Sequence, residues 1–397
     1  MPELNVKWKD NLYHRQLNLL APVGTTGYGV TGFNVLKTLT EREWTVALFP
    51  YGPHGRVGSD AMLIDRAISQ AQMFFHDAPC LNIWHQFELS HSIGKGKYIG
   101  WPIFELDTFN VLEKHHMFYP DQLIVCSEWA KSVIGKIYGE KYDLDTKALQ
   151  DQPSDWLEGE INRCIKVVPL GVDHSIFNTR NKTSSESRDT IFLNVGKWEV
   201  RKGHDILCDV FNNAFSVTDN VQLWLCPHNN FITPSDRLNW ENMYLQSPMG
   251  KAGKIKIHAW QKEHKDLANL MSQATCGVFP SRAEGWNLEL LEMMAMGKPV
   301  IATNYSAHTA FCNSDNCMLI DIDDLELAYD GKWFFEQGHW AALDERQCNQ
   351  LKHHMQVTHE VHRHQHEYTN DAGIQTAKSL TWDNSISILE KILLDNR

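Results

Sequence analysis

The stretch FPSRAEGWNLELLE, residues 279–292, decides how the second half of the chain folds. The apolar run at residues 275–279 predicts a β-strand, because it is short and proline follows it at once. The leucine- and glutamate-rich sequence after the turn predicts a helix as far as Met296, and Gly297 and Pro299 are the usual signals for a helix end. The stretch therefore predicts a strand–turn–helix unit of an α/β fold.

Two carboxylates of this unit are placed to meet a ligand that combines phosphate and sugar groups. Glu284 lies in the turn, and Glu292 lies further along the helix. The residues expected around the start of the helix are Gly285, Trp286, Asn287 and Leu288. A helix start offers backbone N–H groups and the positive end of the helix dipole to a diphosphate. Glu284 can accept hydrogen bonds from a sugar and Glu292 from a ribose, so the stretch predicts a nucleotide-sugar site.

These residues resemble the Glu-x7-Glu motif of retaining glycosyltransferases with the GT-B fold, most closely the large family four (glycosyl transferases group 1). Residues 297–303, which follow, predict a loop and a second buried strand, in the order that this family shows. The resemblance implies that Glu284 orients the donor sugar and that Glu292 binds the ribose. It also implies that the backbone around residues 286–288 binds the donor diphosphate.

A second match to this family begins at the predicted buried strand 190–195. The family usually has Gly-Arg, four residues and then Lys-Gly here, and its two cations neutralise the donor diphosphate. By this resemblance the motif starts at Gly196, and the cations are Lys197 and Lys202. Lysine keeps the charge of arginine but lacks the planar fork that binds phosphate at two points. Arg201 is therefore either a substitute phosphate ligand or an exposed loop charge.

A glycine-rich segment near the start of the chain gives a third candidate. A predicted strand at residues 17–21 leads to Gly24, Gly27 and Gly29, and a helix is expected from residue 30 to 39. The spacing Gly-x-x-Gly-x-Gly differs from the dinucleotide fingerprint, so the loop alone does not indicate an oxidoreductase. In the resembling family this loop lines the cleft near the donor phosphates and the acceptor. The resemblance thus implies that these three glycines bind the donor.

Two residues of the first half are candidates for catalysis. His85 ends a predicted strand and is either a ligand-facing histidine or a hydrogen-bonded scaffold residue. Many members of the resembling family have a histidine just after the next strand, close to the donor sugar. This chain has WPIFELD at residues 101–107 instead, and Glu105 is the candidate for that position, in contact with the sugar or the acceptor.

Strands and helices alternate through both halves of the chain, which predicts two doubly wound sheets. The predicted fold class is α/β, with two Rossmann-like doubly wound domains facing a cleft (GT-B). We expect an N-terminal acceptor-side domain at 1–178, a linker at 179–188 and a C-terminal nucleotide-sugar-binding domain at 189–375. Residues 376–397 are expected to form a helix that crosses back to the first domain. The strands expected in the second domain are 190–195, 221–226, 254–258, 275–279 and 299–303. One face of the last helix should hold Trp382, Ile386, Leu389 and Leu393.

Composition limits the class of protein. A chain of 397 residues fits two α/β domains. Its net charge is −12, and residues 1–170 hold 16 Lys or Arg against 20 Asp or Glu, which disfavours nucleic acid as a partner without excluding it. Nine cysteines without a Cys-x-x-Cys pair favour a reducing compartment. A polar start and the lack of a long apolar run predict no signal peptide and no membrane span, hence a cytoplasmic protein of a host or bacterial cytosol.

A histidine cluster near the end of the chain could suggest a metal site. Its members are His353, His354, His359, His362, His364 and His366. His362 and His366 are spaced to share a helix face. No carboxylate or cysteine pattern completes a ligand set, so the sequence predicts a solvated helix or loop and no metal.

Together these features predict an enzyme that transfers a sugar, with retention, from a nucleoside diphosphate donor to a hydroxyl acceptor. The resemblance implies that no metal or other cofactor is needed and that the donor is most readily UDP- or GDP-linked. The acceptor class stays open between a polysaccharide, a glycolipid and a small glycoside. The alternatives are a transferase acting on hydroxymethylated bases in phage-type DNA, a nucleotide-sugar epimerase and a non-catalytic GT-B partner subunit. The oligomeric state is open as well.

Overall fold

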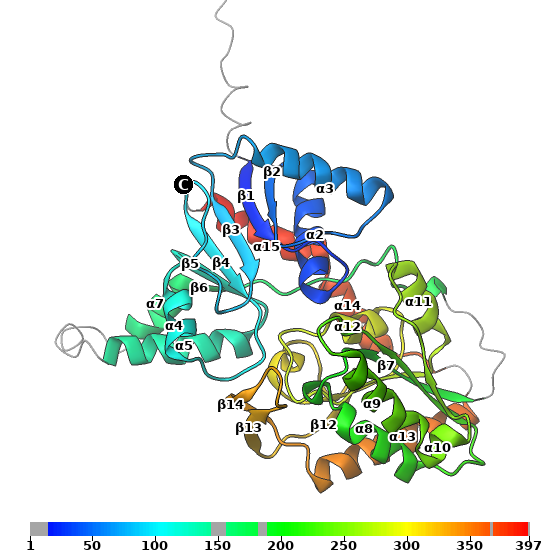
Figure 1. Cartoon of the computed structure of the whole chain (residues 1–397). Coiled ribbons are helices and arrows are strands. Elements are labelled where there is room, and N and C mark those ends of the chain that lie inside the picture. The colour runs from blue at the N-terminus through cyan, green and yellow to red at the C-terminus, as the bar shows by residue number, and fades with distance from the viewer. Residues whose placement is uncertain (1–14, 144–155, 182–188, 366–367, 396–397) are drawn as a thin grey trace, which may run out of the picture. The chain divides into compact units, whose positions relative to one another are not determined.

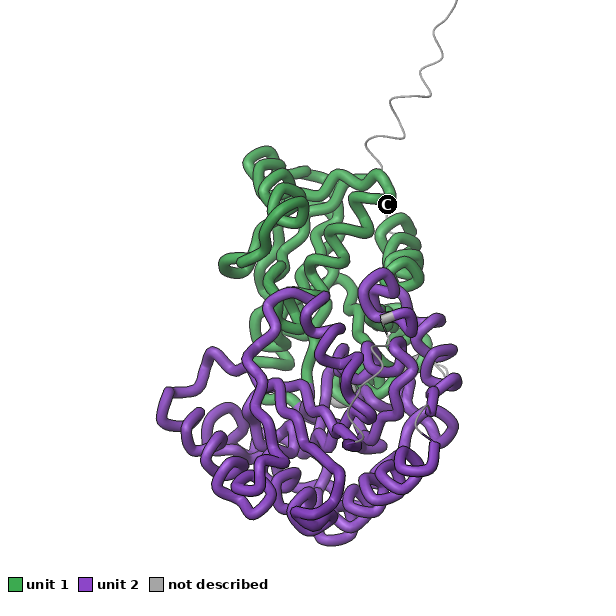
Figure 2. The backbone as a smooth tube through the Cα atoms, turned by 90° about the vertical axis from the view of Figure 1, so that its right-hand side faces the viewer, with its two compact units in different colours: residues 1–104, 109–171, 382–397 green, residues 105–108, 172–381 purple. Residues whose placement is uncertain are grey.

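The computed structural model describes residues 15–143, 156–181, 189–365 and 368–395. The chain divides into two compact units (Figure 2). Unit 1 comprises residues 1–104, 109–171 and 382–397, and unit 2 comprises residues 105–108 and 172–381. Of the predicted linker, residues 179–181 form a short 3-10 helix, whereas residues 182–188 lie outside the described part.

Unit 1 is built on a six-stranded sheet in the order β2-β1-β3-β4-β5-β6, in which every neighbouring pair is parallel. The strands are β1 (Gln16–Ala21), β2 (Thr45–Pro50), β3 (Cys80–Trp84), β4 (Tyr98–Pro102), β5 (Gln122–Val125) and β6 (Ile165–Val167). The helices are α2 (Gly27–Glu41), α3 (Gly58–Ala71), α4 (Val111–Phe118), α5 (Glu128–Asp143), α7 (Trp156–Cys164) and α15 (Trp382–Leu394). The central strands are almost fully buried, as their mainly apolar sequences require, and the buried Asn18 of β1 and Asn82 of β3 are hydrogen-bonded.

Helix α15 belongs to unit 1, although it lies at the other end of the sequence. The four apolar residues predicted to share one of its faces are all buried. Its Glu390 accepts hydrogen bonds from Arg42 Nη1 and Trp44 Nε1, each at 2.8 Å. The apolar face and these two bonds attach the end of the chain to the region of α2 and β2.

Unit 2 contains a second six-stranded parallel sheet, in the order β12-β11-β10-β7-β8-β9 (Figure 1). Its strands are β7 (Thr190–Gly196), β8 (Val221–Pro227), β9 (Ile255–Ile257), β10 (Cys276–Phe279), β11 (Val300–Thr303) and β12 (Met318–Ile320). Its α-helices are α8 (His204–Ala214), α9 (Pro234–Leu245), α10 (Pro248–Lys251), α11 (His264–Gln273), α12 (Leu288–Ala295), α13 (Glu345–His364) and α14 (Asp371–Ser379). The short 3-10 helices are η1 (Thr179–Asn181), η2 (Val200–Lys202) and η3 (Ser306–Ala310). The predicted pair of doubly wound α/β domains is confirmed, and each strand predicted for unit 2 is present within one residue at either end.

The predicted glycine loop is shorter than expected. Helix α2 begins at Gly27, so Gly27 and Gly29 lie in its first turn and only Gly24 lies in the turn before it. A Cβ on Gly29 would lie 2.5 Å from the backbone nitrogen of Gly24, so a glycine at position 29 allows the helix start to pack directly on the turn. The helix begins early because Thr26 is extended and its carbonyl already accepts the N–H of Val30 at 2.8 Å.

A two-stranded antiparallel hairpin in unit 2 was absent from the sequence prediction. It consists of β13 (Leu325–Tyr329) and β14 (Phe335–Ala341), drawn in orange in Figure 1. Ala328 and Trp340 on one face are buried, whereas Leu325 and Leu327 on the other face are 45% and 50% exposed. The hairpin joins the body of unit 2 through Glu326, which accepts a hydrogen bond from Arg282 Nε at 2.8 Å.

Two further observations concern the whole described chain. All nine cysteines are free thiols. Within the ranges that the structure describes, every helix is too short or too polar to cross a lipid bilayer.

Candidate functional site

The candidate site of unit 2 lies where β7 and β10, which are neighbours in the sheet, end. Two parallel strands end at the same edge, so the loops that follow them, 196–203 and 280–288, meet there. The N–H of Arg282 donates to the carbonyl of Arg201 at 2.7 Å, which fixes one loop against the other. Gly203 has a φ of +76°, and a Cβ on it would lie 2.2 Å from the Pro280 carbonyl oxygen. A glycine is therefore required for this close approach.

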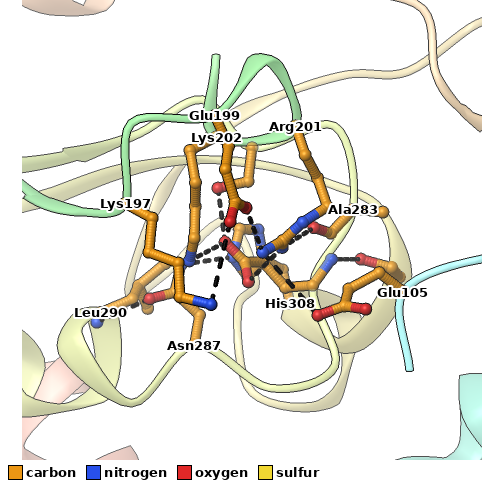
Figure 3. A network of polar contacts seen from close by, with 12 residues as sticks. Glu105, Lys197, Glu199, Arg201, Lys202, Ala283, Asn287, Leu290 and His308 are labelled. Carbon is orange, nitrogen blue, oxygen red and sulfur yellow. Dashed lines mark hydrogen bonds and ion pairs between the residues drawn. The ribbon is translucent and has the colours of Figure 1, made fainter. Parts of the chain in front are cut away.

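Glu284 lies in a polar network, and Figure 3 labels its partners Arg201 and Lys202. The residue is buried, with 4% of its surface exposed. It accepts hydrogen bonds from Lys202 Nζ at 2.6 Å, from Arg201 Nη1 at 3.0 Å and from Ser281 Oγ at 2.6 Å. Burial alone would raise the pKa of Glu284, but the adjacent Lys202 and Arg201 charges outweigh it and hold that pKa well below its usual range. Glu284 is thus a fixed, ionised carboxylate.

Arg201 is buried, so its interpretation as an exposed loop charge is wrong. Its Nη2 donates to Glu199 at 2.8 Å, and its Nη1 donates to the carbonyl of Ala283 at 2.8 Å as well as to Glu284. Burial opposes the charge, but the carboxylates of Glu105, Glu199 and Glu284 raise the pKa of Arg201 above its ordinary value. The guanidinium therefore joins both loops, which a single exposed charge could not do.

The two predicted phosphate cations differ in exposure. The side chain of Lys202 is 11% exposed, and its stem lies 3.5 Å from the position that a Cβ on Gly196 would take. The side chain of Lys197 is 40% exposed, with Nζ at 3.8 Å from Glu199 and 5.6 Å from the centre of the Phe231 ring. Both ammonium groups thus belong to the β7 loop, and Lys197 is the more accessible to a ligand from solvent.

Glu105 joins the same network, although it comes from a distant part of the sequence. The short segment 105–108 belongs to unit 2, and Glu105 Oε1 lies 3.8 Å from Arg201 Nη2. Burial raises the pKa of Glu105, Arg201 lowers it, and the neighbouring Glu284 and Glu199 raise it further. Three carboxylates therefore share Arg201, and Glu105 is the one with the longest contact.

The N-terminus of α12 has an unusual backbone conformation. Asn287 is the N-cap residue, with φ of +82° and ψ of +79°, and its Oδ1 accepts the N–H of Leu290 at 3.2 Å. Gly285, Trp286 and Leu288 are buried around it. The Trp286 ring lies 5.0 Å from that of Phe311, and its Nε1 finds no hydrogen-bond partner within the described ranges.

Glu292 differs sharply from Glu284, although both belong to the same turn and helix. It is 6% exposed, and its Oε2 is fully enclosed without a hydrogen-bond partner in the described part of the chain. Burial raises the pKa of Glu292 well above its usual range, and the Glu289 and Asp173 carboxylates add to this effect. A buried acceptor that lacks a donor is rare in native proteins.

The remaining predicted site residues, His85 and the glycines Gly24, Gly27 and Gly29, belong to unit 1. His85 directly follows β3, and its Nδ1 lies 3.0 Å from the Tyr28 hydroxyl. Its ring is stacked on Phe87 at 5.0 Å. The functions predicted for these four residues stay predictions.

The terminal histidines make contacts within unit 2. Thr190 Oγ1 lies 2.7 Å from His359 Nδ1 and 3.1 Å from His362 Nδ1, which ties α13 to the start of β7. His366 lies outside the described residues. Across the described ranges, no cluster of three or more His, Cys, Asp or Glu residues has the geometry to hold a metal ion.

Sequence reasoning missed several residues that surround Glu284 and Asn287. They are Glu199, Ser281, Arg282, Ser306 and His308. Arg282 donates to both oxygens of Asp205, at 2.8 and 2.9 Å, next to the Gly203 turn. His308 Nε2 lies 2.9 Å from Asn287 Nδ2. No motif distinguishes these residues in the sequence. The partners of Arg282, Ser306 and His308 are distant in sequence, and only the fold brings them near.

Comparison with known proteins agrees with this architecture. Sucrose-phosphate synthase from Thermosynechococcus elongatus has 15% identity and a TM-score of 0.64, with 95% of this chain and 98% of that chain covered. Anabaena HepE, solved in complex with UDP-glucose, has 14% identity and a TM-score of 0.60 over 96% of this chain and all of that one. The lipopolysaccharide outer core galactosyltransferase WaaB in its apo form has 14% identity and a TM-score of 0.59, with 96% and 100% covered. The chain thus has the GT-B fold of glycosyltransferases.

Comparison of the sequence with known families gives a match within unit 2. Residues 189–330 match the family Glycosyl transferases group 1. This region contains both loops of the candidate site and α12. No curated protein matches the sequence.

Proposed function

We propose that the protein is a retaining glycosyltransferase that moves a sugar from a nucleoside diphosphate donor to a hydroxyl acceptor. The match of residues 189–330 to Glycosyl transferases group 1 supports this reaction class. The structure of HepE in complex with UDP-glucose supports a UDP-linked donor as the first to test, with a GDP-linked donor next.

In this proposal the diphosphate binds between the β7 loop and the start of α12. Lys197 and Lys202 supply positive charge from one side. The backbone of residues 285–288 supplies N–H groups and the helix dipole from the other side. Positive charge there stabilises the negative charge that develops on the departing phosphate. Because the lysines and the helix terminus supply this positive charge, the proposed reaction requires no metal ion.

Glu292 is the observation that supports the proposal most directly. The enclosed Oε2 of Glu292 has no donor from the described chain, and burial raises the pKa of the carboxyl. A ribose offers two neighbouring hydroxyl donors, and a hydrogen bond from either to the Glu292 carboxyl group would offset the cost of burying it. A purely structural helix would place an apolar side chain at such a position, because an unpaired buried carboxylate is destabilising.

Glu284 is proposed to orient the donor sugar by accepting hydrogen bonds from its hydroxyls. Lys202, Arg201 and Ser281 hold the carboxylate in one position, which favours a precise donor geometry. Arg201 is proposed to act by fixing Glu284 and Glu199. Glu105, which shares Arg201, is proposed to contact the sugar or the acceptor.

The proposed chemistry breaks the bond between the anomeric carbon and the phosphate oxygen, and the electron pair leaves with the diphosphate. The acceptor oxygen bonds to the anomeric carbon on the same face, and its proton passes to the departing phosphate. The products are a glycoside with retained configuration and a nucleoside diphosphate. No protein carboxylate forms a covalent intermediate in this scheme.

A donor panel tests the proposal. The purified protein is incubated with UDP-, GDP-, ADP- and dTDP-sugars in the presence of EDTA, and thermal stability and nucleotide release are measured. One donor should stabilise the protein and be hydrolysed slowly without an acceptor. Lys202→Ala should weaken its binding, whereas Lys251→Ala, which removes an exposed lysine at the end of α10, should bind normally. Failure of every donor to stabilise the protein would overturn the proposal.

A further inference from the structure

We propose that His308 is a positioning residue: by accepting a hydrogen bond from Asn287 it fixes the start of α12 in the conformation that binds the donor diphosphate. This inference rests on the proposed function, because it concerns the same binding turn. His308 lies in η3, it is fully buried, and its Nε2 is 2.9 Å from Asn287 Nδ2 (Figure 3).

The hydrogen bonds around His308 determine its tautomer. Nδ1 lies 3.0 Å from the carbonyl oxygen of Thr303, which can only accept, so Nδ1 carries the proton. In the neutral ring, Nε2 is then an acceptor and requires a donor. Burial lowers the pKa of His308 to about 4, which keeps the ring neutral at pH 7.

Asn287 has a single amide orientation that satisfies this requirement. Its Oδ1 accepts the backbone N–H of Leu290, so its Nδ2 must face His308. The Thr303 carbonyl orients the imidazole, and the Leu290 N–H orients the amide. The hydrogen bond between the two side chains then fixes each against the other. This chain of bonds links the end of β11 to the first turn of α12.

The backbone around this link explains why a fixing residue is needed. Asn287 has φ of +82°, a region that an asparagine occupies less readily than a glycine. Ser306, next to His308, also has a positive φ, of +52°. Its Oγ accepts the N–H of Glu284 at 2.8 Å, and the N–H of Ala307 donates to the carbonyl of Glu284 at 3.2 Å. Residues 306–308 thus hold the binding turn at both of its ends.

Two substitutions separate positioning from simple stability. An asparagine side chain can replace Nδ1 of histidine, and a glutamine side chain reaches the position of Nε2. His308→Asn should keep the bond to Thr303 and lose the bond to Asn287, whereas His308→Gln should do the reverse. His354→Asn is the matched control, since His354 Nε2 contacts the carbonyl of Leu319 at 2.8 Å, away from the binding turn.

The experiment measures UDP binding by calorimetry and thermal unfolding of the apo protein for the wild type and the three variants. All three should unfold at a lower temperature than the wild type. Only His308→Asn should weaken UDP binding, by about tenfold, the effect of one lost buried hydrogen bond. Equal UDP affinity in His308→Asn and His308→Gln would overturn the inference. If no nucleotide sugar of the donor panel stabilises the wild type, the proposed function fails instead.

A double variant gives an independent check. Glycine reaches a positive φ without help, so in an Asn287→Gly background the His308→Asn change should no longer alter the UDP affinity. A further loss of about tenfold in that background would show that His308 does not act through Asn287.

Discussion

Arg201 donates to Glu284 at 3.0 Å, and both side chains are almost completely buried. A buried ion pair contributes little net stability by itself, because both charges lose their hydration. Removing one member, however, leaves a charge in a place that water cannot reach. Arg201 also holds Glu199 and the Ala283 carbonyl, so one guanidinium joins the loops that follow β7 and β10.

Arg201→Lys should therefore destabilise unit 2 although it conserves the charge. One ammonium group cannot span Glu199, Glu284 and the Ala283 carbonyl as the planar guanidinium does. The loss of buried charged hydrogen bonds predicts a decrease of about 2–3 kcal/mol in the free energy of unfolding, measurable by urea denaturation.

Arg237→Lys is the matched control for this change. Arg237 pairs with Glu241 at 2.7 Å, but its side chain is 67% exposed. An exposed pair of this kind contributes about 0–1 kcal/mol, so its replacement should leave the unfolding midpoint almost unchanged. Equal destabilisation by both substitutions would contradict the bridging role of Arg201.

Glu292→Gln should stabilise the apo protein and weaken donor binding. The raised pKa of Glu292 means that the folded state disfavours its ionised form, and a neutral amide of the same shape removes that disadvantage. At a pH above the pKa of Glu292 in the folded state, the carboxylate is ionised in the folded and the unfolded protein. It then lowers the free energy of unfolding by its full amount. As the pH falls through the folded pKa towards the unfolded value of about 4.3, the folded carboxyl takes up a proton and the disadvantage disappears.

The measurement is thermal unfolding of the wild type and Glu292→Gln at pH 8 and at pH 4.5, with UDP affinity at pH 8. The variant should unfold at a higher temperature than the wild type at pH 8, and the difference should shrink at pH 4.5. Its UDP affinity should be lower at pH 8. A variant with lower apo stability at pH 8 would mean that a donor already satisfies the Glu292 carboxylate.

The sequence predicts the parts of this protein that depend on local pattern. Apolar runs ended by glycine or proline located β7 and β10, and helical spacing located α15. The hairpin β13–β14 could not be found in this way. Its exposed strand positions, such as Leu325 and Leu327, carry apolar side chains, so the alternation of apolar and polar residues that marks a half-buried strand is missing.

Charge and spacing in the sequence select Glu284, Glu292 and Lys202 as candidates, and the roles of these residues stay predictions. The sequence does not predict which of the charged side chains are buried. Burial determines whether a charged group pairs within the protein or faces solvent. Arg201 follows a strand in a charged stretch that suggests solvent exposure. In the fold, the carboxylates of Glu105 and Glu284 and a carbonyl from distant segments surround it, together with the neighbouring Glu199. His308 has no sequence signal, because its importance depends on the tautomer that Thr303 imposes.

Donor binding should not depend on a divalent cation. In the proposed function, Lys197, Lys202 and the start of α12 supply the positive potential that a metal ion gives in other nucleotide-sugar sites. UDP affinity measured in EDTA should equal that in excess Mg²⁺ or Mn²⁺. Lys197→Ala, which removes the more exposed cation, should raise the Kd in both buffers alike. Binding that EDTA abolishes and Mn²⁺ restores would show that a metal takes part.

Mild acid should destabilise the protein through His308. Its pKa is about 4 in the folded state because burial disfavours the charged ring, whereas the unfolded value is about 6.5. Above about pH 6.5 the ring is neutral in both states, and its full contribution to stability is present. Between pH 6.5 and 4 only the unfolded chain binds the proton, so the free energy of unfolding decreases as the pH is lowered. For His308 alone the loss from pH 7 to 5 is about 2 kcal/mol.

Comparison with variants isolates the contribution of His308, because the other titrating groups are common to all of the proteins. These groups include Glu105 and Glu292, whose pKa values are raised, and His204, whose pKa is lowered to about 3. Urea denaturation at pH 7, 6 and 5 should show a stability loss about 2 kcal/mol smaller in His308→Asn than in the wild type. His308→Gln should share this flatter dependence, although it keeps the bond to Asn287. Parallel pH profiles for the wild type and both variants would mean that His308 already takes up its proton in the folded state near pH 6.5, and that the hydrogen bond from Asn287 does not hold the ring neutral.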